Sequence, residues 1–493
     1  MKTLLPRVRS LAALLLCAAL APSAFAAPDV RIERAWRYEH RSAPDGSKAE
    51  IVAYDGSTDT LWVAGVTGVD ILSRVSGQRV AHIPVGQFGA VNSVAVKNGL
   101  AALAIESAVD RTLPGVVVFF DTATRLQSGA PAVVGALPDM LTFTPDGRRV
   151  LVANEGTPNP RPTPAGLGAG DPVGSVSIVD VETRDLATLP LTADIPGYDS
   201  LRAFPGTMSA YGPEPEFIAV DRTGRLAWVG LQEANGVAVL NLRTLRFDRI
   251  FSLGLKDFGQ PGNEIDPGDR DGTVEFVGVP VQGLYQPDGI AAYAFRGRTY
   301  FVLANEGDAR DNGDGDSEDE RRGGAGSGAA RLSDDPRLAR LTLSNVDSVR
   351  GGPLVAFGGR SVSIRDASGA IVWDSGSLLD REAARLGIYD DGRSDNKGVE
   401  PEGVALLEVE GRVLAFVGLE RTTRSAFAVF DVTDPRAVAY VDMVVSPSVD
   451  GQPDDVAPEG LVAFRAGGRT WVALAQEASD TTTLYEVRVG KRR

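Results

Sequence analysis

Cysteine and histidine are almost missing from this chain. Its 493 residues include one cysteine, Cys17, and two histidines, His40 and His82. A zinc site built from cysteine and histidine is therefore nearly excluded. The chain also lacks a Gly-x-Ser-x-Gly nucleophile motif, a Walker loop and a dinucleotide-binding fingerprint. A Ser-His-Asp triad on either histidine is possible but has no supporting motif, so we expect both histidines to be exposed or simply hydrogen-bonded.

Long apolar runs are confined to the N-terminus. Residues 1–26 have the order of a secretory signal, with basic residues first, then the apolar stretch Leu11–Leu20, then the small residues Ala24-Phe25-Ala26 at the cleavage site. Cleavage there would remove Cys17, so disulfides play no part in the mature fold. No later run is long enough to cross a membrane. We predict export to the periplasm or the medium.

Positive charge is scarce. The chain has 50 Lys and Arg against 65 Asp and Glu, a net charge of −15. Removing residues 1–26 takes away three basic residues and no acid, which leaves 47 against 65 and a net charge of −18. Nucleic acid and anionic membrane surfaces are poor partners for such a chain. We expect a cation, a small molecule or an extracytoplasmic partner instead.

One pattern of acids and short apolar stretches recurs along the chain. Each unit starts at a proline-acid turn and ends its second apolar stretch on a glutamate. The two acids are 16 to 18 residues apart in five units, as Asp139 and Glu155, Glu216 and Glu233, Asp288 and Glu306, Glu402 and Glu420, and Glu459 and Glu477. Two earlier units are partial, one with Asn92 and Glu106 and one starting at Glu50. Seven successive units indicate a repeat architecture.

The units are composed of short strands. Leu141–Thr144, Val150–Ala153 and Ser175–Asp180 are apolar or alternating stretches, and Pro145-Asp146-Gly147 is a turn between the first two. Units of about 40 residues with three or four strands are typical of β-propeller blades. A sandwich fits less well, because its strands do not repeat one internal pattern. The sequence predicts an all-β, seven-bladed β-propeller over residues 27–493, as a single domain.

Two further strand predictions concern the ends and the fifth unit. Val30–Trp36 should pair with Leu484–Val489, which would close the ring and cover the edge strands. An acidic, glycine-rich insertion from about residue 307 to residue 359 interrupts the fifth unit. The stretches Arg360–Arg365 and Ala370–Asp374 should then supply its outer hairpin.

Propeller geometry would gather the repeated acids at one mouth of the channel. The start of the first strand and the end of the second lie on the same face, because the two strands are antiparallel. The channel-mouth acids predicted in this way include Glu106, Glu155, Glu216, Glu233, Glu402, Glu420, Glu459 and Glu477. Two carboxylates about 6 Å apart repel by roughly 3 kcal/mol at an effective dielectric of 20. We expect them to be protonated, paired with arginine, bound to a hard cation or, in the simplest alternative, bonded to backbone amides.

Two loops have the spaced aspartates and glycines of an oxygen-rich calcium site, although neither matches the EF-hand. One runs from residue 263 to 272 and the other from residue 306 to 320. The predicted calcium ligands are Glu306, Asp308 and Asp311, with Asp266, Asp269 or Asp271 as further ligands. The alternative is a solvated acidic insertion.

An ordered set of motifs resembles the bacterial choice-of-anchor I family over nearly the whole mature chain. The motifs are Ala304–Asp311, Asn263–Gly272, Phe357–Ser361, Arg393–Gly403, Gly418–Arg421 and Phe430–Pro435. The resemblance implies a secreted or surface propeller, related to phytase-like and esterase-like propellers, and some relatives carry an alkaline phosphatase label. Members have variable C-terminal anchors, whereas this chain ends at Val489-Gly-Lys-Arg-Arg with no anchor signal, so we expect a soluble protein.

The leading functional interpretation is a binding protein, and the alternative is a calcium-dependent phosphoesterase. In that enzyme, carboxylate-bound calcium would orient phosphate and activate water. Arg310, Arg393, Lys397 and Arg421 are the basic residues near the motifs that could contact phosphate.

Overall fold

The computed structural model describes residues 29–43, 47–158, 172–204, 212–310, 319–326 and 331–490. The predicted signal peptide and Asp311 lie outside these ranges. Strands dominate the described residues, confirming the all-β prediction, and α1 (Leu378–Arg385) is their one α-helix. Three short 3-10 turns are Tyr198–Ser200, Pro336–Leu338 and Asp391–Arg393.

Seven sheets of the described chain contain four antiparallel strands each. Sheets 1 to 4 follow one another along the chain. Sheet 1 has β2 (Ile51–Asp55), β3 (Thr60–Gly65), β4 (Gly68–Ser73) and β5 (Arg79–Pro84), and sheet 2 has β6 (Val91–Lys97), β7 (Leu100–Ile105), β8 (Pro114–Asp121) and β9 (Ala132–Ala136). Sheet 3 has β10 (Pro138–Phe143), β11 (Arg149–Asn154), β12 (Ser175–Asp180) and β13 (Leu186–Pro190), and sheet 4 has β14 (Ile218–Val220), β15 (Leu226–Leu231), β16 (Gly236–Asn241) and β17 (Arg246–Ser252).

Sheets 5 to 7 complete the series. Sheet 5 has β20 (Ile290–Phe295), β21 (Arg298–Asn305), β25 (Ser361–Asp366) and β26 (Ile371–Asp374), and sheet 6 has β27 (Pro401–Val409), β28 (Arg412–Leu419), β29 (Ala426–Asp431) and β30 (Ala439–Val445). Sheet 7 has β31 (Pro458–Ala466), β32 (Arg469–Gln476), β33 (Thr481–Val489) and β1 (Val30–Glu39). The predicted outer hairpin of the fifth unit is confirmed as β25 and β26.

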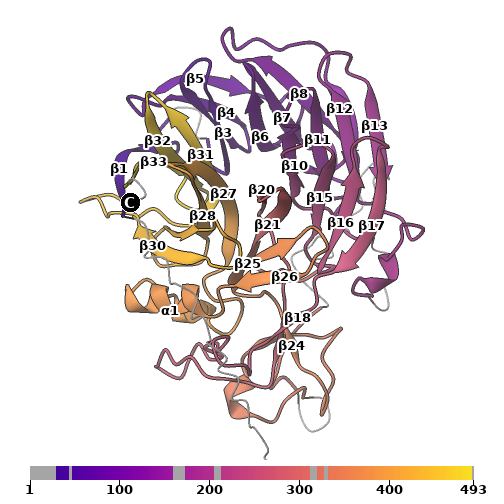
Figure 1. Cartoon of the computed structure of the whole chain (residues 1–493), viewed down its shortest axis with the longest axis vertical. Coiled ribbons are helices and arrows are strands. Elements are labelled where there is room, and N and C mark those ends of the chain that lie inside the picture. Colours follow the sequence, from indigo (N-terminus) through magenta and orange to yellow (C-terminus); the bar gives the residue numbers. More distant parts are fainter. Residues whose placement is uncertain are drawn as a thin grey trace, which may run out of the picture.

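The first strands of the seven sheets contact one another in a closed series. The contacts run from β2 to β6, β10, β14, β20, β27 and β31, and β31 contacts β2 again. Figure 1 shows the sheets arranged in chain order around a common centre. This arrangement is consistent with a propeller.

Both faces of the inner sheets are buried, which explains their continuous apolar composition. Along β3, Trp62 and Ala64 pack in a cluster with sheet 2, whereas Leu61 and Val63 pack on the opposite face with Trp471 of sheet 7. Each large apolar side chain buried in this way contributes roughly 1.5–3 kcal/mol. Packing between neighbouring sheets therefore holds the ring together.

Pairing between the two ends of the chain closes sheet 7. The antiparallel register joins Val30 to Val489 and Trp36 to Leu484, as the sequence predicted. The outer strand β1 thus comes from the start of the chain, and the other three strands come from its end. β33 pairs with β32 on one side and with β1 on the other, so this last strand is not an edge strand.

A buried polar chain joins sheet 7 to sheet 1. His40 Nδ1 lies 2.7 Å from Asp70 on β4, and His40 Nε2 lies 2.8 Å from Thr482 Oγ1 on β33. Burial would raise the pKa of Asp70, but hydrogen bonds from His40 and His82 outweigh it and lower the pKa. All three members of the His40 chain are fully buried, so the triad-like geometry has no access to substrate and its role is structural.

We expect His40→Ala to destabilise the protein by about 2–4 kcal/mol, because Asp70 and Thr482 lose a buried partner. Urea unfolding would measure the change. Arg41→Ala is the control, since the Arg41 side chain is 65% exposed although it also pairs with Asp480. A His40→Ala variant as stable as Arg41→Ala would contradict the structural role.

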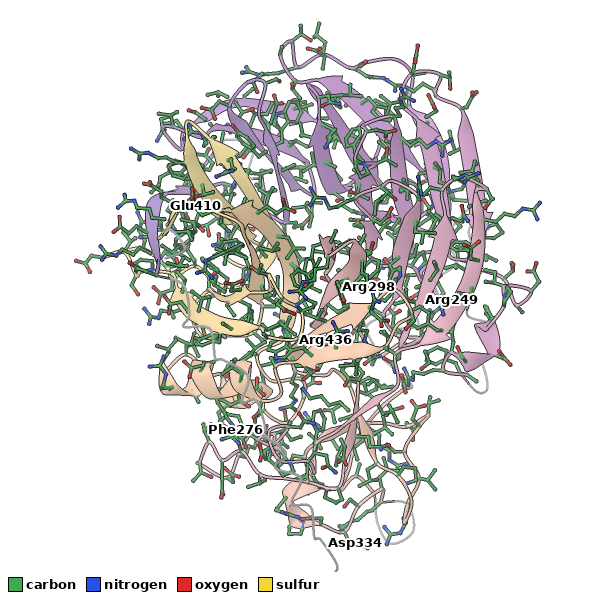
Figure 2. The ribbon with its side chains drawn as sticks, viewed as in Figure 1. Arg249, Phe276, Arg298, Asp334, Glu410 and Arg436 are labelled. Carbon is green, nitrogen blue, oxygen red and sulfur yellow. The ribbon has the colours of Figure 1, made fainter. Side chains whose placement is uncertain are left out.

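A further sheet lies outside the ring of seven. Its strands are β18 (Leu255–Asp257), β19 (Gln282–Leu284), β24 (Val355–Ala356), β23 (Thr342–Ser344) and β22 (Glu320–Arg322), and it packs on its own apolar cluster. The predicted insertion includes β22 to β24, but β18 and β19 come from residues before it. Figure 1 shows β18, β24 and α1 below the ring, and Figure 2 places Phe276 and Asp334 in the same lower region. We call this five-stranded sheet, together with the segments that connect its strands, the inserted sheet.

Within the described ranges, no helix has the length and apolar character needed to span a bilayer.

Candidate functional site

A β-bulge at the start of the first strand aims the first acid of several units. The pairing register shifts between Pro138 and Met140, between Pro401 and Val404, and between Pro458 and Leu461. The residues within these shifts include Asp139, Glu402 and Glu459. A bulge adds an unpaired residue and changes the direction of its side chain. This local irregularity turns the first acids away from the regular alternation of the strand.

The residue before the proline is held in a left-handed conformation. Leu137, Gln286, Glu400 and Ala457 have φ values of 45°, 40°, 51° and 56°. Such values are uncommon for residues other than glycine and recur where the surrounding structure demands them. The carbonyls of Leu137, Glu400 and Ala457 accept the N–H of the second acid of the same unit at 2.8–2.9 Å. This bond brings the two acids of a unit to the same end of the hairpin.

Glycine after the acid lets neighbouring first strands approach closely. A Cβ on Gly289 would lie 2.4 Å from the Glu402 carbonyl oxygen, and one on Gly403 would lie 2.6 Å from that of Glu459. The third contact is that of Gly460, whose N–H donates to the Glu50 carbonyl at 3.0 Å. Only glycine fits at these contacts without displacement, so the glycine brings successive acids together.

These features surround a cavity of about 550 Å³. Its lining contains ten carboxylates, which are Glu50, Asp139, Glu216, Asp288, Glu306, Asp308, Glu402, Glu420, Glu459 and Glu477. Among the lining residues that the structure describes, only Lys397 and Arg421 are basic. Of the eight predicted channel-mouth acids, Glu106, Glu155 and Glu233 are not among the lining residues. We call this space the acidic cavity.

Burial and mutual repulsion hold many of these acids toward their neutral form. Burial, with the charge of neighbouring acids, raises the pKa of Asp139 to about 8 and that of Asp288 to about 7. The same causes raise the pKa values of Glu216, Glu402 and Glu459 well above their ordinary range. Without a cation, the acidic cavity therefore retains protons near neutral pH.

Three carboxylates on sheets 6 and 7 form a compact group within the acidic cavity. Glu402, Glu420 and Glu459 each offer an oxygen within 4.8 Å of the others. Oxygens that share one calcium ion are at most about 5 Å apart, because each lies 2.3–2.6 Å from the ion. Glu402 Oε2 is buried without a hydrogen-bond partner among the described residues, while Glu420 pairs with Arg421 at 2.7 Å. The spacing suits a hard cation.

Lys397 neutralises the acids beside this group. Its Nζ lies 3.0 Å from Glu306, 3.2 Å from Glu400 and 3.5 Å from Asp308. Burial would lower the pKa of Lys397, but these three acids raise it well above its ordinary value. Glu306 Oε2 also accepts from Gln232 Nε2 at 2.8 Å. Two predicted calcium ligands, Glu306 and Asp308, are thus already paired with an ammonium group.

The remaining predicted channel-mouth acids lie in other surroundings. Glu155 and Glu233 form a group with Glu214, whose oxygen is 2.8 Å from Arg310 Nη2. Burial raises the pKa of Glu233 to about 7 although the charge of Arg310 opposes it. Burial also raises the pKa of Glu106, against the charge of Arg111.

The aspartates of the loop at residues 263–272 lie at the inserted sheet and do not line the acidic cavity. Asp269 bonds the guanidinium of Arg340, with one N–O distance of 2.6 Å, and this bond lowers the pKa of Asp269 to about 2. Burial raises the pKa of Asp266 to about 7. The structure therefore separates Asp266, Asp269 and Asp271 from the acidic cavity to which Glu306 and Asp308 belong.

Sequence reasoning missed several residues of this region. The sequence identifies Glu400 only as part of the Arg393–Gly403 motif, and Lys397 only as one of the basic residues that could contact phosphate in the phosphoesterase alternative. Their signal was the dense run of charged residues from 393 to 402, which sits directly before a unit start. Asp391 and Asn396 were not singled out at all.

Comparison with known proteins identifies the family to which the chain belongs. A mesenchyme-specific cell surface glycoprotein of Strongylocentrotus purpuratus is 26% identical over 332 residues, which are 56% of this chain and 40% of that protein, so the chain spans well under two thirds of this relative. Hydrazine synthase of Kuenenia stuttgartiensis shares 11% identity at a TM-score of 0.49, over 90% of this chain and 96% of that chain, which is too weak a likeness to carry an argument. The model of the choice-of-anchor I domain matches residues 50–435. Because this match covers most of the sequence and agrees with the motif resemblance, the chain belongs to the choice-of-anchor I family.

Proposed function

We propose that this protein is an exported seven-bladed β-propeller whose acidic cavity binds a divalent cation, calcium, and through it a small ligand or an extracytoplasmic partner. Family membership supports a surface or secreted protein of propeller type. The closed series of contacts among the first strands of seven sheets supports seven blades. The charged and apolar order of residues 1–26 supports export.

The observation that carries the cation proposal is the group of Glu402, Glu420 and Glu459. Their oxygens are within 4.8 Å of one another, and Arg421 is the only basic side chain paired with them among the described residues. A bound cation would convert repulsion among the carboxylates into attraction. Calcium suits the group because it accepts six to eight oxygens in flexible geometry, whereas soft thiolate and imidazole ligands are absent here.

The rest of the cavity leaves room for a ligand. A volume of about 550 Å³ lies within the usual range of small-molecule sites. A cation held by three glutamates would retain open coordination positions toward this space. Oxygen-bearing ligands such as hydroxyls or carboxylates fit those positions by their chemistry.

The phosphoesterase alternative has less support. Phosphate would need basic groups or bound metal to overcome the ten carboxylates of the lining. Lys397 is shared by Glu306, Glu400 and Asp308, and Arg421 is paired with Glu420. Both basic groups already pair with acids, so we favour a binding function over hydrolysis.

Calcium titration of the metal-free mature protein by calorimetry tests the proposal. We expect the double variant Glu402→Gln/Glu459→Gln to weaken binding at this site by at least about 100-fold, because two of three charged ligands are lost, each worth at least about tenfold. Glu410→Gln is the matched control: it carries the same change in the turn between β27 and β28, at the other end of the hairpin (Figure 2).

Equal calcium binding by the double variant and the control would refute the calcium site at Glu402, Glu420 and Glu459. Turnover of a chromogenic phosphomonoester by the calcium-loaded wild type, lost in the double variant, would instead favour the hydrolase.

A further inference from the structure

Glu155, Glu214 and Glu233 form a carboxylate group outside the acidic cavity. Each of them offers an oxygen that lies within 4.8 Å of those of the other two, and none of them lines the acidic cavity. Glu155 follows β11 of sheet 3, whereas Glu214 precedes β14 and Glu233 follows β15 of sheet 4. The group therefore bridges two neighbouring sheets, and we call it the sheet 3–4 group.

One carboxylate of the sheet 3–4 group is buried with an unpartnered oxygen. Glu233 is 5% exposed, and its Oε2 makes no hydrogen bond among the described residues. The Thr157 hydroxyl donates to Glu155. Arg310 Nη2 lies 2.8 Å from Glu214, but no ion pair among the described residues reaches Glu155 or Glu233. A buried carboxylate oxygen is unfavourable unless a donor, a proton or a cation meets it.

The repeat places an equivalent group between sheets 5 and 6. Its members are Glu306, Glu400 and Glu420, whose oxygens also lie within 4.8 Å of one another. In both groups the first glutamate ends the second strand of one unit, the second precedes the proline of the next unit, and the third ends the second strand of that next unit. We call the second set the sheet 5–6 group, and it shows what this arrangement of glutamates accommodates.

Basic side chains neutralise the sheet 5–6 group. Lys397 Nζ lies 3.0 Å from Glu306 and 3.2 Å from Glu400, so an ammonium group is shared by two of the three acids. Arg393 also pairs with Glu400, and Arg421 pairs with the third member of the group. Three basic residues thus meet three carboxylates. At this position of the repeat, the glutamates hold a cation supplied by the chain.

The sheet 3–4 group has no such balance among the described residues. Three carboxylates and one paired guanidinium, that of Arg310, leave a net charge of −2. Like charges this close repel one another, and the repulsion is strong where water is excluded. A divalent cation carries the charge that balances the group and would meet the unpartnered oxygen of Glu233.

We propose that Glu155, Glu214 and Glu233 bind a calcium ion that joins sheet 3 to sheet 4, in the place that the Lys397 ammonium fills in the sheet 5–6 group. Oxygens that share one calcium ion are at most about 5 Å apart, because each lies 2.3–2.6 Å from the ion. Carboxylate oxygens are ligands that calcium prefers, and soft ligands are absent from the group. This structural site is separate from the one at Glu402, Glu420 and Glu459 and does not depend on it.

Backbone contacts hold two of the ligands in position. The Glu155 N–H donates to the Leu137 carbonyl at 2.9 Å, and the Glu233 carbonyl accepts from Arg202 Nη1 at 2.7 Å. Arg202 in turn pairs with Asp319 of the inserted sheet at 2.8 Å. Ligands that are fixed before binding lose little freedom when the ion enters, which favours affinity.

Calorimetric titration of the metal-free protein with calcium counts the sites. The variant Glu402→Gln/Glu459→Gln removes the proposed site of the acidic cavity, and we call it the cavity-site variant. We expect it to retain one equivalent of calcium. Adding Glu155→Gln/Glu233→Gln should weaken this remaining binding by at least about 100-fold, since the loss of a group that only supports a metal ligand already costs 10–100-fold.

Glu106→Gln is the matched control. Glu106 also follows the second strand of its unit, β7, but it belongs to none of the close carboxylate groups of the described residues. Added to the cavity-site variant, Glu106→Gln should leave the calcium affinity within about twofold of its parent.

Hydrogen exchange provides a local readout. In the cavity-site variant, calcium should slow the exchange of the amides around Glu155 and Glu233, because opening these segments then requires release of the ion. The amides of sheet 7 should exchange at the same rate with and without calcium. Protection that appears in sheet 7 but not in sheets 3 and 4 would overturn the site.

A single substitution guards against misfolding. Without calcium, Glu233→Gln in the cavity-site variant should be at least as stable as its parent, because it removes a buried charge beside like charges; with calcium, the parent should gain more stability. An equal gain would overturn the site, as would calcium binding that survives Glu155→Gln/Glu233→Gln unchanged. A cavity-site variant that binds no calcium would also refute the sheet 3–4 site, whereas one that binds as much as wild type would refute only the site of the acidic cavity.

Discussion

Replacing Lys397 with methionine is expected to destabilise the protein by about 3–5 kcal/mol, the largest effect of any single substitution considered. The ammonium group lies within 3.5 Å of Glu306, Glu400 and Asp308, and the side chain is 11% exposed. Its removal leaves the buried Glu306 carboxylate without its cation, whereas Glu400 keeps Arg393. Breaking a buried ion pair from one side costs about this much. Denaturant unfolding at pH 7.5 in the presence of chelator would measure the change.

A second substitution separates charge from packing. Lys397→Met/Glu306→Gln should recover part of the loss, because Glu306 is the buried acid that pairs with Lys397 and the double variant leaves no charge on it. Lys48→Met is the control: Lys48 also approaches two acids, Glu50 at 3.8 Å and Glu477 at 3.6 Å, but it is 47% exposed and should matter by less than about 1 kcal/mol. Similar effects for the two lysines would show that the Lys397 cluster is well solvated.

The metal-free protein is expected to lose stability as the pH rises from about 5 to 8. Glu50, Asp139 and Asp288 have pKa values of about 7, 8 and 7 in the folded protein, raised by burial and neighbouring acids. In the unfolded chain they titrate near 4. Within this window the folded state binds more protons than the unfolded state, so the free energy of unfolding falls with rising pH.

Thermal unfolding at pH 5 and pH 8 would measure this slope. One pKa unit corresponds to about 1.4 kcal/mol, so the three groups together can lower the free energy of unfolding by about 5 kcal/mol or more. A chain of this size has an unfolding entropy of about 1 kcal/mol per degree, so the midpoint should be lower by roughly 5 °C at pH 8. Calcium should restore most of the loss at pH 8 and little at pH 5, because carboxylates must be deprotonated to bind it. Glu402→Gln/Glu459→Gln should shift less with calcium. A stability that is flat or rising over this window would contradict the assignment of protonated acids in the cavity.

The repeat pattern predicted more of the site than any single motif did. Because alternating strands and proline-acid turns act locally, the sequence alone indicated the strands, the end-to-end pairing of Val30 with Val489 and the convergence of acids such as Glu402 and Glu459. The glycines after the acids were visible too, at Gly289, Gly403 and Gly460, but their role depends on a strand of the next sheet. That dependence is why the sequence did not reveal it.

The side-chain contacts of the loops were predicted less well, because they join residues that are far apart along the chain. The calcium interpretation of Glu306 and Asp308 rested on spacing within one loop, and the structure places Lys397, 91 residues from Glu306, between them. Asp266 and Asp391 belong to loops that Arg360 brings together across 94 and more residues of sequence. No local pattern records such contacts.

The sequence by itself determined the strand-rich repeat, the net acidity and the recurrence of paired acids, because each depends on residue type and short spacing. Only the tertiary structure decided which acids share a space, which are neutralised and which stay unpaired. Those outcomes depend on burial and on neighbours supplied by other sheets. A carboxylate such as Asp269 has a pKa near 2 beside Arg340, whereas Asp266, three residues earlier, has a pKa near 7 because it is buried without such a partner.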